Sequence, residues 1–325
     1  MATQPMKRIL LTGAAGQIGT ELLPALRARY GAESVVATDV RPRPEHAAFA
    51  GGPYELLDIT DRKAVEALLD KYKVDAIFHL AALLSATGEQ NPQLCWRVNM
   101  DGLYLILEIG RERGLSRVVY PSSIAVFGPE TPRDNTPQET VLKPRTMYGV
   151  TKVAGELLGD YYFRKFGLDC RGLRYPGIIS SEAPPGGGTT DYAEAIFYEA
   201  VKAGRYKCFL GPETALPMMY MPDAVKALMQ LAEADITTLA HHCDFNIGAM
   251  SFTPAELAAE IKKHVPGFEI TNEPDFRQAI ADSWPRSIDD AAARKEWGWR
   301  PDYDLAAMVG DMLEKLSARH KAGKL

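Results

Sequence analysis

Residues 8–19 read RILLTGAAGQIG, and this stretch decides the fold. It begins as a short apolar strand, and the leucines in residues 20–26 that follow it have the spacing of a helix. Gly13, Gly16 and Gly19 allow a tight turn between strand and helix, where backbone N–H groups and the helix dipole attract an anion. The order of strand, glycine turn and helix predicts a βα unit that binds the pyrophosphate of a dinucleotide. The turn also contains Gln17 and Ile18, which we expect beside the cofactor.

Short apolar runs alternate with longer amphipathic stretches along most of the chain. Strands that are apolar on both faces and separated by helices are typical of a parallel sheet covered on both sides. The sequence therefore predicts an α/β fold with a doubly wound parallel sheet. The expected strands are residues 8–12, 34–39, 54–57, 76–81, 117–121, 171–175 and 245–248.

The alternation breaks after Tyr175, where residues 180–190 contain two prolines and a run of three glycines. We expect a smaller C-terminal substrate domain to begin there. The predicted division assigns residues 1–177 and 220–252 to the dinucleotide-binding domain, and residues 178–219 and 253–325 to the substrate domain.

Composition argues against several classes of protein. The 325 residues carry a net charge of -5 and no long run of Lys or Arg, so the basic footprint of a nucleic-acid binder is missing. No apolar stretch has the length of a membrane span or the features of a signal peptide, and we expect a cytoplasmic protein. No metal site is expected, because the cysteines lack metal-ligand spacing; they are Cys95, Cys170, Cys208 and Cys243.

The end of the second expected strand indicates which dinucleotide binds. Asp39 follows Gly19 by 20 residues, at the position where a carboxylate accepts hydrogen bonds from the adenosine ribose. This favours NAD, since the carboxylate would repel a 2′-phosphate, although the nearby Arg41 and Arg43 leave NADP open. The ends of other strands open onto the same crevice, and there we expect Asp58, Ile59, Leu80, Ala81, Ala82 and Tyr175 near the cofactor.

A candidate acid/base pair follows the fifth expected strand. Tyr148 and Lys152 are four residues apart, on one face of an expected helix. A phenol has a pKa of about 10, but an adjacent ammonium and a positively charged nicotinamide both favour the phenolate. Ser123, 25 residues before Tyr148, supplies a hydroxyl at the mouth of the same crevice.

The ordered set of glycine turn, Asp39, Asn99, Ser123 and Tyr148-x-x-x-Lys152 resembles the extended short-chain dehydrogenase/reductase family, over nearly the whole chain. The resemblance implies a Rossmann fold in which Ser123 holds the substrate oxygen and Tyr148 is the acid/base. It also implies that Lys152 binds the nicotinamide ribose and lowers the pKa of Tyr148, and that Asn99 braces the site. The family also contains epimerases and dehydratases that act on nucleotide sugars, and this activity is the alternative.

Four stretches resemble the short-chain type of L-threonine 3-dehydrogenase more narrowly, and the third is the most specific. They are LLSATGE at 83–89, YPGIIS at 175–180, GGGTTDYA at 186–193 and ADSWP at 281–285. This subfamily oxidises the β-hydroxyl of L-threonine with NAD to 2-amino-3-oxobutanoate. The positions that the resemblance assigns to the substrate pocket are Ser85, Ser123, Tyr148, Thr189 and Trp284.

Four further expectations follow from the residues. The loop at 180–190 has no basic residue for a diphosphate, which counts against a nucleotide-sugar substrate, and the helix that begins near Thr190 offers N–H groups to a substrate carboxylate. The intact Ser123, Tyr148 and Lys152 set speaks against a protein that only binds NAD. The helices near 92–113 and 147–166 are apolar on more than one face, so we predict a homodimer built on them.

Overall fold

A computed structural model describes residues 3–183 and 188–325. Its centre is a parallel sheet of six strands, as counted in these described residues. The strand order reverses between β1 and β4, and in such sheets ligands bind at the carboxyl ends of the strands beside this reversal. The spatial order is β3 (Tyr54–Leu56), β2 (Val35–Asp39), β1 (Ile9–Thr12), β4 (Ala76–His79), β5 (Arg117–Val119) and β7 (Cys170–Arg171).

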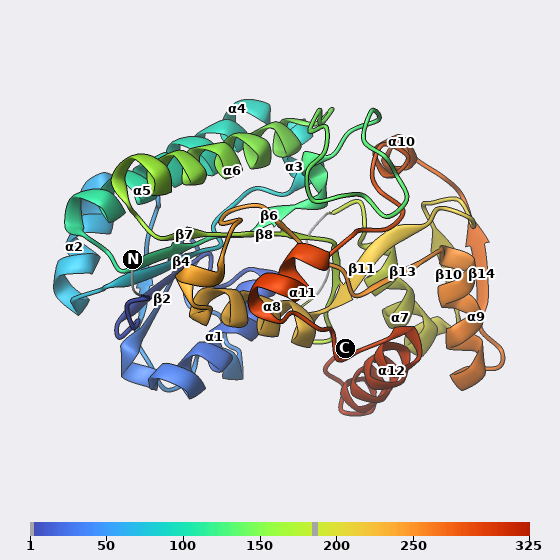
Figure 1. The fold of residues 1–325 in the computed structure, drawn as a ribbon. Helices are drawn as coiled ribbons and strands as arrows, with labels where there is room; N and C mark the ends of the chain where they lie inside the picture. Colours follow the sequence, from blue (N-terminus) through green and yellow to red (C-terminus); the bar gives the residue numbers. More distant parts are fainter. Residues whose placement is uncertain (1–2, 184–187) are drawn as a thin grey trace.

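Helices cover both faces of this sheet (Figure 1), which confirms the predicted doubly wound α/β fold. The first face carries the long pair α5 and α6, and the opposite face carries α1 and α8, which pack on each other. The helices of the first face are α2 (Arg62–Tyr72), α4 (Pro92–Trp96), α5 (Gly102–Arg113) and α6 (Met147–Phe166), with a π-helical turn (Arg97–Asp101) joining α4 to α5. Those of the second face are α1 (Gln17–Tyr30) and α8 (Met221–Glu233).

The carboxyl ends of two strands continue past a break into a small second sheet. β5 leads into β6 (Ser122–Ser123), and β7 leads across Gly172 into β8 (Leu173–Tyr175), which also pairs with β12 (Phe245–Asn246). A Cβ on Gly172 would lie 2.6 Å from the Tyr120 carbonyl oxygen, so only glycine fits at this crossing. All seven predicted strands are confirmed, although the one predicted over 171–175 is divided in two.

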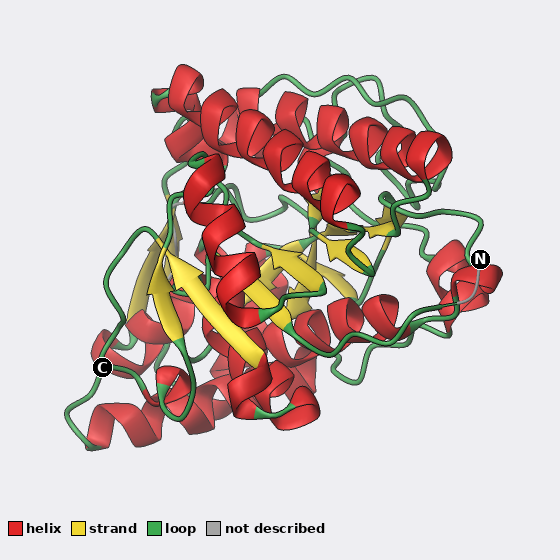
Figure 2. Ribbon diagram, turned by 90° about the vertical axis from the view of Figure 1, so that its left-hand side faces the viewer, coloured by secondary structure: helices red, strands yellow, loops and turns green. Residues whose placement is uncertain are grey.

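The remaining strands form two small sheets that the sequence pattern did not predict. One is a mixed sheet in the order β13, β11, β9, and the other is the parallel pair β10 and β14. Figure 2 shows the same molecule turned by 90°. These strands are β9 (Gly177–Ile179), β10 (Arg205–Cys208), β11 (Leu216–Tyr220), β13 (Met250–Phe252) and β14 (Glu269–Asn272).

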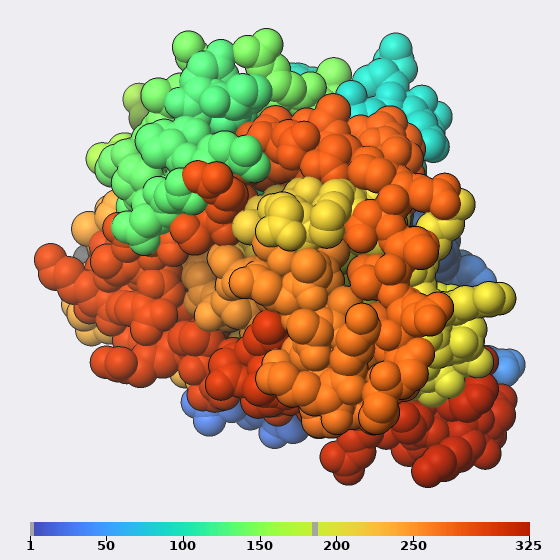
Figure 3. Space-filling model, turned by 90° about the vertical axis from the view of Figure 1, so that its right-hand side faces the viewer, coloured from blue at the N-terminus to red at the C-terminus, as the bar shows by residue number. Residues whose placement is uncertain are grey.

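Helices α7, α9 and α12 pack around these small sheets. Figure 3 shows this side of the molecule, where the last part of the chain, coloured orange to red, forms most of the surface. The predicted division into two domains remains a prediction. The helices here are α7 (Tyr192–Ala203), α9 (Pro254–His264), α10 (Arg277–Ala281) and α12 (Leu305–Lys321). Of the other helices, α11 (Ala291–Trp297) packs against β12, and α3 (Ser85–Gln90) packs against α4 and α6.

A local signal explains where α9 begins. Thr253 and Glu256 form a capping box at the start of α9, with the Thr253 hydroxyl accepting from the Glu256 N–H. Within the described residues, no helix combines the length and the apolar character that a membrane crossing requires.

Candidate functional site

The glycine turn after β1 has the close backbone packing that a phosphate cradle needs. Gly13 has a φ of +66°, and a Cβ there would lie 2.6 Å from the Ala81 nitrogen. A Cβ on Gly19 would lie 2.5 Å from the Gly13 carbonyl oxygen. Because the N-cap residue of α1 is Gly16, no side chain covers the first N–H groups of that helix. These groups can receive a pyrophosphate.

Asp39 lies at the end of β2 and is attached to the same turn. Its Oδ2 accepts a hydrogen bond from the Ala15 N–H at 3.1 Å, and its side chain is buried. Arg41 donates from Nε to Oδ1 at 3.0 Å, while its own side chain is 60% exposed. The carboxylate is therefore held where the adenosine ribose is expected, and an exposed guanidinium is paired with it.

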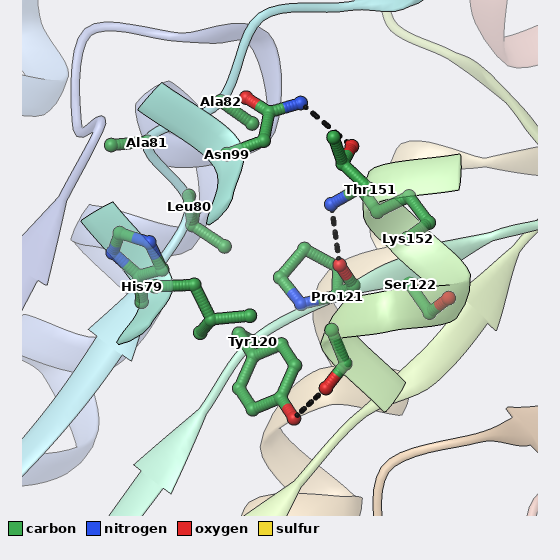
Figure 4. Close-up of a pocket in the computed structure, with 12 residues that line it drawn as sticks. His79, Leu80, Ala81, Ala82, Asn99, Tyr120, Pro121, Ser122, Thr151 and Lys152 are labelled. Atoms are coloured by element: carbon green, nitrogen blue, oxygen red, sulfur yellow. Dashed lines mark hydrogen bonds between the residues drawn. The ribbon is translucent and has the colours of Figure 1, made fainter. Parts of the chain in front are cut away.

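The residues after β4 line two neighbouring cavities. Leu80 and Ala82 border both cavities, and Ala81 borders the smaller one, which Figure 4 draws. His79, at the end of the strand, is buried and shares a hydrogen bond of 2.8 Å with the Thr12 hydroxyl. Burial lowers the pKa of His79 to about 3, so this ring stays neutral in the site.

Asn99 connects the loop after β4 to helix α6. Its Oδ1 accepts from the Leu83 N–H at 2.8 Å, and its Nδ2 donates to the Leu83 carbonyl at 3.1 Å. The same Nδ2 donates to the Thr151 hydroxyl at 3.3 Å, as the dashed line in Figure 4 marks. The residue after Thr151 is Lys152, so this geometry agrees with a bracing role, which stays a prediction.

Ser123, Tyr148 and Lys152 all border the larger cavity. Lys152 donates from Nζ to the Pro121 carbonyl at 2.7 Å (Figure 4), and this nitrogen lies 5.4 Å from the centre of the Tyr148 ring. The Ser123 hydroxyl accepts from the Ala125 N–H at 3.2 Å. The three groups predicted as catalytic thus lie together in one cavity.

Burial controls the protonation of this set. It raises the pKa of Tyr148 to about 12, although a hydrogen bond with the Ser123 hydroxyl acts in the opposite direction. Burial also lowers the pKa of Lys152 to about 8, and the negative charge of Glu156 opposes that fall. Without ligands, the phenol is neutral at pH 7 and the lysine is mostly an ammonium.

A buried polar network behind Lys152 was missed by the sequence analysis. Glu156, one turn after Lys152 on α6, accepts from Arg174 Nη2 at 2.8 Å and from the Ser122 hydroxyl. Arg174 also donates to the Asn246 Oδ1 at 3.1 Å. The spacing of Glu156 four residues after Lys152 is the signal that could have identified it, since it places both side chains on one helix face.

The larger cavity has a volume of about 140 Å³ and collects most of the predicted positions. Thr189 is 1% exposed, and among the residues that the structure describes none hydrogen-bonds its hydroxyl. Trp284 borders the cavity and also belongs to the adjoining apolar core. The predicted residues that line it are Gln17, Ile18, Leu80, Ala82, Ser85, Ser123, Tyr148, Lys152, Tyr175, Thr189 and Trp284.

Asp58 and Ile59 lie just after β3, the strand next to β2, and their role at the cofactor stays a prediction. Asp58 is exposed and accepts hydrogen bonds from the N–H and hydroxyl of Thr60, and Ile59 is buried in the core under α5. Neither borders the two cavities found in the described residues. Part of the glycine run singled out in the sequence, Gly186 and Gly187, lies outside the described residues.

The chain was compared with known proteins. Residues 9–248 match the model of the NAD dependent epimerase/dehydratase family. The chain is 50% identical, over 96% of its length and 83% of the relative's, to the mitochondrial L-threonine 3-dehydrogenase of Sus scrofa. It is 51% identical, over 97% of its length and 99% of the relative's, to an uncharacterized epimerase/dehydratase of Staphylococcus haemolyticus.

A solved structure shares the fold over nearly the whole chain. The L-threonine dehydrogenase from Clostridium difficile superposes with a TM-score of 0.95 at 51% sequence identity. The match covers 97% of this chain and 99% of that chain.

Proposed function

This chain belongs to the NAD dependent epimerase/dehydratase family, and we propose that within it the chain oxidises the β-hydroxyl of L-threonine to 2-amino-3-oxobutanoate with NAD. The observation that carries the proposal is the single cavity bordered by Ser123, Tyr148 and Lys152 in a chain about half identical to enzymes named L-threonine dehydrogenase. A secondary alcohol, an acid/base phenol and a nicotinamide cradle are the components that such an oxidation requires.

The glycine turn supports the fit of a dinucleotide, because Gly13 and Gly19 permit close backbone packing that any Cβ would prevent, and Gly16 leaves the start of α1 without a side-chain cap. NAD, when bound, accepts the hydride from the substrate carbon. In the proposed step, Tyr148 takes the proton of the threonine hydroxyl while the Ser123 hydroxyl orients the same oxygen. The Lys152 ammonium and the positive charge of a bound nicotinamide both favour the phenolate, so bound NAD would lower the pKa of Tyr148 from its ligand-free value of about 12.

The substrate side of the cavity supplies polar groups for an amino acid. The buried Thr189 hydroxyl can donate to the substrate carboxylate. The start of α7 adds the positive end of a helix dipole, while the N–H groups of Ala193 and Glu194 already donate to backbone carbonyls. Ser85 and Trp284 border the same cavity, where Ser85 adds a hydroxyl and Trp284 an apolar wall. We assign these positions to substrate binding.

We further propose that NAD is preferred to NADP. Asp39 is buried beside the cradle, and its negative charge opposes a 2′-phosphate. Arg41 is already paired with this carboxylate, which reduces its availability to such a phosphate.

A homodimer through α4, α5 and α6 is also proposed. These helices expose a set of large apolar side chains, which in a lone chain would remain in contact with water. The set consists of Leu94, Trp96, Tyr104, Val150, Leu157, Tyr161 and Phe166.

A single assay tests the proposed activity. Purified protein is mixed with NAD and L-threonine, and absorbance at the NADH wavelength is followed, with NADP as the second cofactor and L-allo-threonine as the second substrate. We expect sustained NADH formation with NAD and L-threonine. The alternative, epimerisation or dehydration of a nucleotide sugar, regenerates the bound cofactor and releases no NADH. The proposal would be overturned if the protein converted a nucleotide sugar and formed no NADH from threonine.

A further inference from the structure

Glu194 is a buried carboxyl group of α7 that contacts the glycine turn. Gln17 donates from Nε2 to Glu194 Oε2 at 2.5 Å, and the Ser180 N–H donates to the same oxygen at 3.2 Å. The side chain of Glu194 is 1% exposed. This contact joins residues that are 177 positions apart in the sequence.

The two partners belong to different sides of the larger cavity. Gln17 is the first residue of α1 and borders the cavity at the dinucleotide turn. Thr189 and Thr190 border it just before α7, and Glu194 lies in the first turn of that helix. One hydrogen bond therefore restrains both the cofactor turn and the start of the helix on the substrate side.

The charge around Glu194 favours its neutral form. The titratable groups that face it are Glu21 of α1, Asp191 at the N-cap of α7 and Tyr198 of α7, and none of them is cationic. Burial raises the pKa of Glu194 to about 9 and that of Glu21 to about 7. At neutral pH Glu194 is thus a neutral acid that accepts at Oε2, and within the described residues its Oε1 has no partner.

We propose that Glu194 is a positioning residue, which holds the cofactor turn through Gln17 and the substrate side of the cavity through α7. The role in turnover rests on the proposed threonine dehydrogenase activity. A restraint shared by two binding sites couples their binding free energies, and the coupling is reciprocal. Loss of the contact should therefore weaken the binding of both NAD and threonine, rather than slow the proton transfer alone.

The test compares Glu194→Ala, Gln17→Ala and the double variant. NAD affinity is measured by the quenching of protein fluorescence, and KM for threonine and kcat are measured from NADH formation. We expect each single variant to raise both the NAD Kd and the threonine KM by about tenfold, as for loss of one buried hydrogen bond, with a smaller change in kcat. The double variant should raise neither constant beyond its value in Glu194→Ala, because that change already removes the contact with Gln17 as well as the hydrogen bond from the Ser180 N–H. Glu199→Ala, on the same helix but away from the cavity, is the matched control and should behave as the wild type.

Glu194→Gln tests whether a neutral acceptor is sufficient. This variant should recover both constants to within about threefold of the wild type. The proposal is wrong if the losses of the single variants multiply in the double variant, if Glu194→Gln is as impaired as Glu194→Ala, or if Gln17→Ala leaves the NAD Kd unchanged. If Glu194→Ala does not fold, the NAD Kd and the threonine KM of Gln17→Ala and Glu194→Gln still test the proposal. The NAD affinities test the contact even if wild-type protein does not oxidise threonine, an outcome that would refute only the proposed function.

Discussion

Replacing Glu156 by Gln is the perturbation that best tests the electrostatics of the site. The side chain keeps its size but loses the charge that faces Arg174, whose Nε and Nη2 donate to the carboxylate at 2.9 and 2.8 Å. Both side chains are less than a tenth exposed. Removing one partner of such a buried pair lowers the free energy of unfolding by about 3–5 kcal/mol, because the other charge stays buried without its partner.

The structure narrows this range. Asp244 lies 3.7 Å from Arg174 and still compensates part of its positive charge in the variant. We therefore expect the free energy of unfolding to fall by about 3 kcal/mol, near the lower end of that range. With an unfolding entropy of about 2.1 cal/mol/K per residue, a chain of this length has about 0.7 kcal/mol/K, and the loss lowers Tm by about 4 °C. Scanning fluorimetry measures this shift. Glu112→Gln, which removes an exposed ion pair with Arg62, is the control and should change Tm by less than about 1 °C.

The same variant should alter the pH dependence of turnover. The negative charge of Glu156 raises the pKa of Lys152 against burial, so its removal lowers a pKa that is already about 8. Lys152 then loses its proton at a lower pH, and the alkaline limb of the kcat/KM profile should move toward neutral pH. An unchanged Tm would refute the assigned role of the buried pair. A profile parallel to that of the wild type would refute the influence of Glu156 on Lys152.

Four further predictions concern single residues. Tyr148→Phe should lower kcat by about a hundredfold or more while NAD binding is kept, and near-normal turnover would assign the base elsewhere. Asp39→Asn should raise the efficiency with NADP relative to NAD by about tenfold, since the repulsion of a 2′-phosphate is lost; an unchanged ratio of the two efficiencies contradicts the role of Asp39. Leu157→Glu, at a side chain that is 66% exposed, should convert a dimer into a monomer in sedimentation experiments, and a monomeric wild type would show the dimer proposal to be wrong. Burial lowers the pKa of His79 to about 3, so between about pH 3 and 6.5 this side chain binds a proton in the unfolded chain but not in the native one. His79 therefore lowers the free energy of unfolding by about 1.4 kcal/mol for each pH unit as the pH falls through that window. His79→Gln should show a shallower fall than the wild type in urea titrations, and equal slopes would contradict the neutral buried ring.

Short-range features of this protein could be predicted from its sequence. The glycine turn, the paired spacing of Tyr148 and Lys152, and the capping box of Thr253 and Glu256 depend on residues a few positions apart, and their geometry follows from the helix or turn that contains them. Apolar runs flanked by helical patterns were sufficient for the parallel sheet, because only a buried strand needs apolar side chains on both faces. The small strands after Tyr175 were missed because β10 and β14 carry exposed polar side chains instead of forming an apolar run, and β11 contains Pro217.

The partners of the buried carboxyl groups depended on tertiary structure alone. Glu156 meets Arg174, and Glu194 meets Gln17, across separations of 18 and 177 residues, which no local pattern encodes. The sequence also left the protonation of Tyr148 and Lys152 undetermined. Their pKa values shift with burial, and burial depends on every element packed around them. The residue types therefore indicate the chemistry, while the folded chain sets the charge state in which those residues perform it.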